Sequence, residues 1–301
     1  MNLLEWASGL AQRLLSEQGA AALRDAYFTL RGRAAPVLRL MHGSFGTAAL
    51  RAHLEEKVGQ DFEILMVHSS VNHLKPMFNG SALDLVRMLV DFCGPTRTLA
   101  MPAFYFGESA EGGALATFRK NPRFDIRRTP SQMGLATELF RRMPGVRQSR
   151  HPVYRISALG PLAEALTQGH EHASGPAGIG SPFDFMAQHD TCIIGIGKPM
   201  QVLTQAHHTE GLMGNAFPLP WREGETMDLT LIDKGEEIPF KMVSRGVIGR
   251  FNIWKLRAIM APGTLLEWNF HHVPMFATRA RSVTEQSVAA ARRGVTLFDP
   301  E

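Results

Sequence analysis

The segment Thr204-Gln-Ala-His-His-Thr-Glu-Gly211 combines residue types that can move a proton. On a helix, Thr204, His207 and Glu210 lie at positions i, i+3 and i+6, close to one face. A carboxylate beside a histidine raises its basicity, so His207 is expected to act as a general base with Glu210 as its partner. Gly211 continues this face and lets another group approach the backbone closely. His208 points elsewhere on this spacing, which favours a structural role.

A polar triplet, His68-Ser69-Ser70, directly follows an apolar run that ends at Val67. In open α/β sheets, ligands bind beyond the carboxyl ends of the strands. The triplet is therefore expected to offer hydroxyls and backbone N–H groups to a ligand. A simple strand-to-loop cap is the alternative.

The segment Arg127-Arg-Thr-Pro-Ser-Gln132 has the pattern of a helix start. Thr129 suits the N-cap, Pro130 the first helical position and Gln132 the third position of a capping box. A helix N-terminus attracts anions, and two arginines before it strengthen that attraction. A phosphate or pyrophosphate site is one interpretation. An ordinary helix start with solvated arginines is the other.

Other kinds of site have weaker support. In Ser149-Arg-His-Pro152, His151 is either a base that faces a ligand or, as the favoured interpretation, a hydrogen-bonded turn residue. The histidines and Glu210 are zinc-type ligands, but no His-x-x-x-His pair or other ligand spacing is present in the 204–211 segment, so no metal site is predicted. The sequence lacks G-x-S-x-G, a complete dinucleotide fingerprint and a Walker A loop, which argues against a serine hydrolase and against NAD or ATP as main cofactor.

Apolar strands alternate with helices from residue 47 onward, which predicts an α/β fold whose mixed sheet carries helices on both faces. The expected strands are 63–67, 98–102, 155–158 and 191–197. The expected helices are 48–58, 81–92, 132–142, 162–167, 183–188, 203–213 and 283–293. Segments 227–232 and 238–243, joined across 233–235, predict a β-hairpin in a partly antiparallel C-terminal portion.

Composition narrows the class of protein. The 301 residues are 45% hydrophobic with a net charge of +4, which excludes a mainly disordered chain. No apolar run approaches the roughly 18 residues of a bilayer helix, so no membrane span is expected. Two cysteines exclude a disulfide framework, and a start without Lys or Arg is not a secretory signal, so we expect a cytoplasmic protein. The basic residues are scattered, so the pI near 9.3 favours small anionic ligands over nucleic acid.

The chain divides at about residue 46. Leucines at roughly helical spacing predict an N-terminal helical extension over 1–46, followed by one catalytic domain over 47–301. The extension is expected to pack on that domain or on a second subunit, in which case the protein is a homodimer. These leucines are Leu3, Leu4, Leu10, Leu14 and Leu15.

Taken in order, the motifs resemble those of the aminoglycoside 3-N-acetyltransferases, a family of antibiotic N-acetyltransferases. The family shows V-H-S-S at a strand end, F-D before T-P-x-x-x-G, R-S-x-H-P, G-x-x-S-P, a strand with G-V-G, and T-S-L-H-L-A-E. The matching segments, spread over 47–214, are Val67-His-Ser-Ser70, Phe124-Asp125, Thr129-Pro-Ser-Gln-Met-Gly134, Gln148-Ser-Arg-His-Pro152, Gly178-Ile-Gly-Ser-Pro182, Gly195-Ile-Gly197 and Thr204-Gln-Ala-His-His-Thr-Glu210.

This resemblance implies an α/β fold unlike that of the GNAT superfamily, and acetyl transfer from acetyl-CoA to a primary amine. By position, His207 matches the family's catalytic histidine and Glu210 its partnered acid, and Thr204, at the start of this motif, is expected in the catalytic set with them. Backbone N–H groups near the V-H-S-S motif would hold the thioester oxyanion. The residues expected along the CoA channel are His68, Ser69, Ser70, Arg128, Thr129, Ser131 and Met133.

Departures from the family pattern concern the acceptor. The loop from Lys198 to Leu203 has six residues where the family has four, and His208 replaces an apolar residue. The residues expected to contact the acceptor are Asp125, His151, Lys198 and His208.

An aminoglycoside is a polycation and this chain is basic, so the favoured acceptor is a less cationic amine. An amino sugar of a glycan or natural-product pathway fits best, and an aminoglycoside-modifying resistance enzyme is the alternative. Two alternatives come from other functional classes. One is a metal-dependent hydrolase that uses the His/Glu cluster, and the other is a non-catalytic CoA-binding protein.

Overall fold

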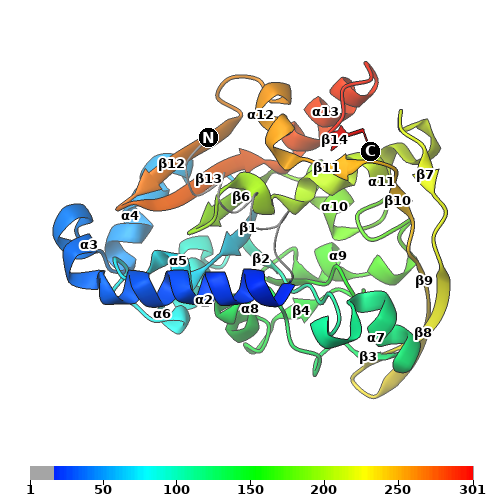
Figure 1. Cartoon of the computed structure of the whole chain (residues 1–301), viewed down its shortest axis with the longest axis horizontal. Coiled ribbons are helices and arrows are strands. Elements are labelled where there is room, and N and C mark those ends of the chain that lie inside the picture. Colours follow the sequence, from blue (N-terminus) through cyan, green and yellow to red (C-terminus); the bar gives the residue numbers. More distant parts are fainter. Residues whose placement is uncertain (1–16, 301) are drawn as a thin grey trace.

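The computed structural model describes residues 17–300, and its centre is a seven-stranded mixed sheet (Figure 1). The strand order is β12-β13-β6-β1-β2-β5-β4. The strands are β1 (Ile64–Ser69), β2 (Thr98–Pro102), β4 (Arg147–Gln148), β5 (Ile156–Leu159), β6 (Thr191–Ile196), β12 (Leu265–Phe270) and β13 (Val273–Arg279). Strands β6, β1 and β2 run parallel, while the other neighbours in this sheet pair antiparallel. The carboxyl ends of the three parallel strands therefore meet at one edge of the sheet.

Helices cover both faces of this sheet, which confirms the predicted fold class. Leu65 and Val67 of β1 face a cluster built with α4 (Thr47–Val58), α6 (Ala82–Cys93) and α8 (Leu135–Phe140). Ile64 and Met66 face the opposite cluster, built with α9 (Ala163–Thr167), α10 (Pro182–Gln188), α12 (Leu256–Ile259) and α13 (Ala280–Ala291). All six residues of β1 are buried because this strand lies between the two layers.

The predicted β-hairpin is confirmed, but it lies outside the main sheet. Strands β8 (Thr226–Asp233) and β9 (Glu236–Val243) pair with β3 (Arg123–Asp125) over a separate aromatic core to which α7 (Ala114–Lys120) contributes. Two small ribbons complete the fold. They pair β7 (Trp221–Arg222) with β10 (Gly246–Val247), and β11 (Arg250–Phe251) with β14 (Phe298–Asp299).

The antiparallel hairpin β12–β13, which extends the main sheet, was not predicted. His271 and His272 connect its strands, and both have positive φ values of 48° and 62°. Such two-residue turns normally carry Asn or Gly, so a His-His pair gives no hairpin signal in the sequence.

Several predicted elements match the structure closely, and one strand is longer than expected. Strand β2 has the predicted bounds, whereas β1 runs on through His68 and Ser69 because they continue the ladder with Gly195 and Ile196 of β6. Two residues of the polar triplet, His68 and Ser69, thus belong to the strand itself.

The N-terminal segment forms two helices within the described residues. They are α2 (Glu17–Arg33), which runs past α5 (Val71–Leu74) in Figure 1, and α3 (Ala35–His42). The leucines at positions 3–15 lie outside the described part of the chain. Among residues 17–300, no helix has both the length and the apolar character needed to cross a membrane.

Candidate active site

His207 and Glu210 form the hydrogen-bonded pair that their spacing predicts. A 3-10 turn at Thr204–His207 leads into α11 (His208–Met213), and His207 Nδ1 lies 2.8 Å from Glu210 Oε1. The side chain of His207 is 30% exposed and that of Glu210 13%, so the histidine is the member that solvent and ligands reach. A carboxylate at Nδ1 keeps the proton there and leaves the Nε2 lone pair to accept another.

Aromatic side chains surround this pair. The His207 ring stacks on Phe251 at 4.3 Å between centroids. Burial raises the pKa of Tyr154, and the negative charge of Glu210 raises it further, so this phenol lies near the pair. No motif or spacing in the sequence singles out Tyr154, which is distant in the chain from this pair.

The residues next to this pair in sequence, Thr204, His208 and Gly211, differ in their contacts. Thr204 Oγ1 is buried and has no hydrogen-bond partner within the described chain. His208, expected near the acceptor, is fully buried, donates from Nδ1 to Ala177 O at 2.6 Å, and has its pKa lowered by burial. A Cβ at Gly211 would lie 2.8 Å from Ala177 O, so the group that approaches this glycine is the chain's own backbone.

The residues of the polar triplet at the end of β1, His68, Ser69 and Ser70, lie in three different environments. His68 is on the face of the 207–210 segment, buried, with no hydrogen-bond partner for Nε2 among residues 17–300. Burial, together with the charge of Lys198, lowers the pKa of His68 to about 3. Alternation along the strand turns Ser69 to the opposite face. Ser70 precedes α5, and its N–H donates to Ile196 O at 2.9 Å, which removes it as the expected oxyanion donor.

The segment 126–133, here called the cofactor loop after the role expected of it from the sequence, is not the predicted helix start. Helix α8 begins at Leu135, after Gly134 with a φ of 101°. Asp125 Oδ1 accepts the backbone N–H groups of Arg127 and Arg128 at 2.9 and 2.8 Å, which closes a turn. That contact occupies Asp125, which was expected at the acceptor.

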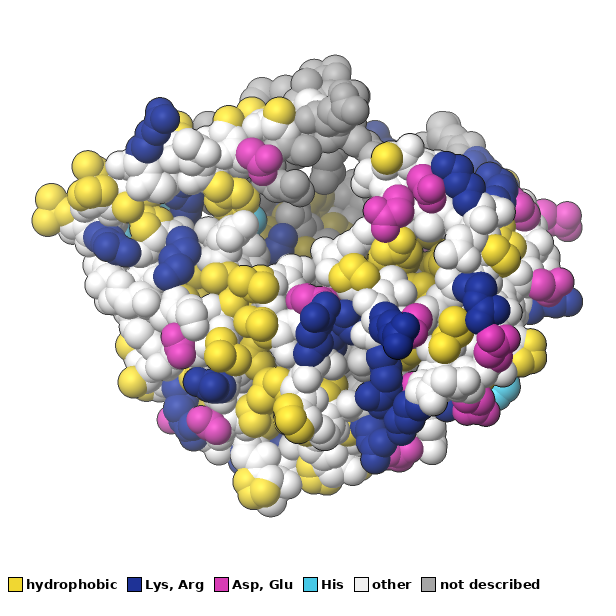
Figure 2. Space-filling model, turned by 90° about the horizontal axis from the view of Figure 1, so that it is seen from below, with side chains coloured by type: hydrophobic (Ala, Val, Ile, Leu, Met, Phe, Trp, Pro, Cys, Tyr) yellow, Lys and Arg dark blue, Asp and Glu magenta, His cyan; other side chains and the backbone are white. Residues whose placement is uncertain are grey.

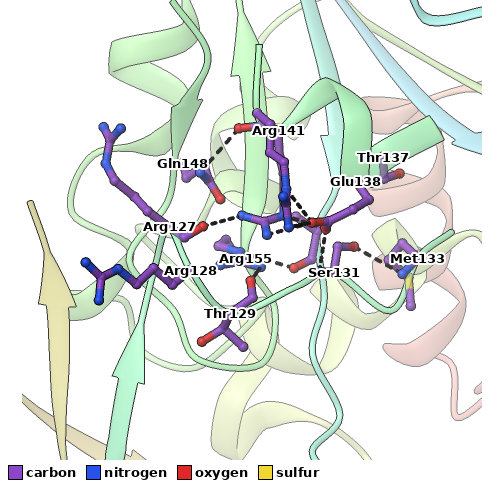
Figure 3. A network of polar contacts seen from close by, with 12 residues as sticks. Arg127, Arg128, Thr129, Ser131, Met133, Thr137, Glu138, Arg141, Gln148 and Arg155 are labelled. Carbon is purple, nitrogen blue, oxygen red and sulfur yellow. Dashed lines mark hydrogen bonds and ion pairs between the residues drawn. The ribbon is translucent and has the colours of Figure 1, made fainter. Parts of the chain in front are cut away.

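Buried arginines bind carbonyl oxygens of the cofactor loop, Thr129 O among them (Figure 3). Arg155, 0% exposed, donates to the carbonyls of Ala103, Ile126 and Thr129. Arg141 donates to Arg127 O at 2.6 Å. Because Arg155 binds Thr129 O, the first carbonyl that a helix starting at Thr129 would use is taken by a guanidinium group.

Further contacts of the cofactor loop come from α8. Glu138 accepts the N–H of Ser131 at 2.8 Å and two hydrogen bonds from Arg141 at 2.6 and 2.8 Å. Burial acts to raise the pKa of Glu138, but the hydrogen bonds from Arg141 and Ser131 outweigh it and the pKa is lowered. Ser131 Oγ in turn accepts the N–H of Met133.

Gln132 joins the cofactor loop to the chain that leaves β2, which the capping-box prediction missed. Its backbone N–H donates to Phe104 O at 2.9 Å, and its side chain binds Phe106 N and Gly107 O at 2.7 and 2.8 Å. Next to it, Met133 packs on the apolar cluster that contains Phe104. The loop therefore lies at the carboxyl end of β2.

One apolar cluster also connects the cofactor loop to the catalytic candidates. Leu203 and Ala206, on either side of Thr204, belong to the same cluster as Met133, Tyr154 and Phe251. The structure thus brings the loop and the 204–210 segment onto one face of the sheet, near its carboxyl edge.

His151 and Lys198, the two other residues expected to contact the acceptor substrate, lie in different surroundings. His151 is buried, its Nδ1 accepts the N–H groups of Val153 and Tyr154, and its ring stacks on His170 at 4.7 Å. It is the turn residue that the sequence favoured, which argues against its expected role at the acceptor. Lys198 follows β6 and lies close enough to lower the pKa values of His68 and His73.

Within residues 17–300, no three His, Cys, Asp or Glu side chains are grouped so as to hold a metal ion.

The sequence model of the aminoglycoside 3-N-acetyltransferase family matches residues 66–261. An aminoglycoside N(3)-acetyltransferase III of Salmonella sp is 30% identical over 195 residues, which are 62% of this chain and 65% of that protein. A second N(3)-acetyltransferase III of Salmonella sp is 31% identical over 197 residues, with 59% and 68% covered. The chain thus matches slightly less than two thirds of the first relative's length.

Solved structures share the fold. Aminoglycoside acetyltransferase AAC(3)-Xa superposes with a TM-score of 0.71 at 21% identity, covering 88% of this chain and 99% of that one. AAC-IIIb, solved as a binary complex with CoASH, gives 0.66 at 20% identity, with 85% and 99% covered.

Replacing Arg155 by Met tests the anchoring of the cofactor loop. The variant leaves two buried carbonyl groups and the partly buried one of Thr129 without their donor, so we expect the free energy of unfolding to fall by about 3 kcal/mol. Arg147→Met is the control, because Arg147 pairs with Glu164 at an exposed position and should change stability by less than about 1 kcal/mol. Urea unfolding measures both, and equal stabilities would contradict the anchoring role.

Acid should destabilise the fold through its buried histidines. Burial lowers the pKa of His170 to about 4, below the unfolded value of 6.5. Between these values the unfolded chain binds more protons, so stability present above pH 6.5 is lost as the pH falls toward 4, by about 2 kcal/mol for this residue between pH 7 and pH 5. In urea unfolding at both pH values, His170→Asn should show a smaller loss than the parent. If His170→Asn and the parent lose the same stability between pH 7 and pH 5, the acid sensitivity does not come from His170.

Proposed function

The chain belongs to the aminoglycoside 3-N-acetyltransferase family, and on this premise we propose that it transfers the acetyl group of acetyl-CoA to a primary amine of an aminoglycoside-type acceptor. The observation that carries the proposal is the 2.8 Å contact between His207 Nδ1 and Glu210 Oε1, at a position where His207 is partly exposed. This pair stands in the motif that matches the family's catalytic histidine and its acid.

His207 supplies the proton acceptor that the reaction needs. An amine attacks a thioester only in its neutral form, whereas an alkylammonium predominates at pH 7. His207 Nε2 takes the proton of the amine as the nitrogen–carbon bond forms, and Glu210 stabilises the imidazolium that results. The carbon–sulfur bond then breaks, and the imidazolium returns the proton to the CoA thiolate, which leaves as the thiol. A base so placed accelerates the step roughly 100- to 10,000-fold. Acetyl-CoA, when bound, supplies the activated acetyl group.

The residues at the sheet edge fit such a co-substrate. His68 Nε2 is a buried polar atom without a hydrogen-bond partner in the described residues, as expected for a group that a polar ligand completes. Ser70 and the cofactor-loop residues Thr129, Ser131 and Met133 would hold the pantetheine arm, and Arg128, 91% exposed, is open to a phosphate. Ser69 faces away from this group, so it contributes least.

Matches to named aminoglycoside acetyltransferases favour an aminoglycoside over the less cationic amine expected from net charge. One structural observation still supports the second candidate. Asp125, expected at the acceptor, is engaged by its own turn, and two further acids of the segment 108–125 have local partners, Glu108 in Tyr105 and Glu111 in Lys120. On the face in Figure 2, acidic side chains are likewise interspersed with Lys and Arg.

The His207→Ala variant tests the proposal by the rate of CoA thiol release with an aminoglycoside and with a simple amino sugar. We expect turnover to fall about 100- to 10,000-fold with little change in the Kd of CoA. His189→Ala is a matched control, since His189 also contacts a carboxylate, Glu63, through Nδ1 and is also 30% exposed. The control should react at the parental rate.

Two results would contradict the assignment. Loss of CoA binding in His207→Ala would place His207 in the cofactor site. Unchanged turnover would remove it from the reaction.

A further inference from the structure

Helix α2 contacts the loop that follows the proposed cofactor strand. Arg31 donates from Nε to Lys75 O at 2.8 Å and from Nη2 to His73 O at 3.1 Å. Phe28, one turn earlier, presents its ring edge-on to His73 at 4.9 Å between centroids. Helix α2 precedes residue 66, so these contacts come from outside the region that matches the family.

His73 transmits this contact to Ser70. Its Nδ1 lies 2.7 Å from Ser70 Oγ, which fixes the hydroxyl at the carboxyl end of β1. Burial, followed by the charges of Lys198 and Arg31, lowers the pKa of His73 to about 4. The ring is therefore neutral at pH 7, and its Nδ1 can accept a hydrogen bond from the Ser70 O–H while the Ser70 oxygen accepts a further hydrogen bond.

Close packing leaves this arrangement little freedom. A Cβ at Gly197 would lie 2.8 Å from Ser70 O and 3.2 Å from His73 Cβ, so the end of β6 presses directly on α5. Helix α2 holds the other side of the same loop through Arg31. The hydroxyl of Ser70 is thus set by residues from three separate segments of the chain.

We propose that the N-terminal extension supports the acetyl-CoA site: Phe28 and Arg31 position His73, and His73, by accepting the O–H of Ser70, leaves the Ser70 oxygen to accept an amide N–H of the pantetheine arm. The inference rests on the proposed function, since it takes Ser70 to be a cofactor contact. His73, Phe28 and Arg31 are positioning residues, because none of them is required to touch the ligand.

Calorimetric titration with CoASH, which needs no turnover, tests the role of His73. His73→Leu removes the partner of Ser70 and should raise the Kd of CoASH about three- to tenfold. His73→Asn places a polar atom where Nδ1 was, so it should restore the Kd to within about twofold of the parent. In steady-state kinetics, the KM for acetyl-CoA should follow the Kd, while kcat stays near the parental value.

Two arginine variants test the role of the extension. Arg31→Gln should raise the Kd of CoASH as His73→Leu does. Arg39→Gln is the matched control, because Arg39 ties the same extension to Pro76 O at 2.9 Å without contacting His73, and it should bind CoASH like the parent. Melting temperatures of all variants separate a local effect from loss of folding.

Ser70→Ala distinguishes the two ways in which the idea can fail. If Ser70→Ala weakens CoASH binding but His73→Leu and Arg31→Gln do not, the positioning role is wrong and the cofactor site stands. If Ser70→Ala binds CoASH like the parent, the proposed place of the cofactor is wrong and the inference falls with it. If Arg31→Gln and Arg39→Gln raise the Kd of CoASH equally, the extension only stabilises the fold and does not position His73.

Discussion

The guanidinium of Arg155 is a buried positive charge whose hydrogen bonds, within residues 17–300, all end on backbone carbonyls. A buried charge is costly unless its donors are satisfied, so the segments that carry these carbonyls must stay together. They are the exit of β2, which carries Ala103 O, and the cofactor loop, which carries the carbonyls of Ile126 and Thr129. The ring of Phe124, 5.4 Å from the charge, adds a favourable cation–π contact. Burial lowers the pKa of Arg155 to about 9, which keeps it charged at pH 7.

Anchoring of the cofactor loop has a consequence for chemistry at the other end of the site. Met133 on the loop and Leu203 beside the catalytic candidates belong to one apolar cluster, so both segments pack on the same side of the sheet. The two tasks of the proposed reaction, holding a thioester and taking a proton from an amine, are thereby assigned to segments that one core supports. A rigid support of this kind is what a transfer between two bound molecules requires.

Local patterns in the sequence predicted the parts of the molecule that local forces decide. The bounds of β2 and the contact between His207 and Glu210 follow from runs of apolar residues and from helical spacing. The predicted helix start at Thr129 failed because Arg155, 26 residues away, takes the carbonyl oxygen of Thr129. His151 and His208 have the residue type of site residues, yet only tertiary packing shows that both are buried. The N-terminal contact with His73 likewise depends on segments that no spacing connects.

Hydrogen exchange with and without acetyl-CoA tests most directly whether the cofactor loop and the end of β1 form one binding site. With saturating acetyl-CoA, amide exchange should slow in peptides that cover 126–133 and in those that cover 68–72, because a bound ligand suppresses local opening of both segments. Exchange in the exposed strand β9 should stay the same. Protection that appears elsewhere while these two segments remain unchanged would contradict the account.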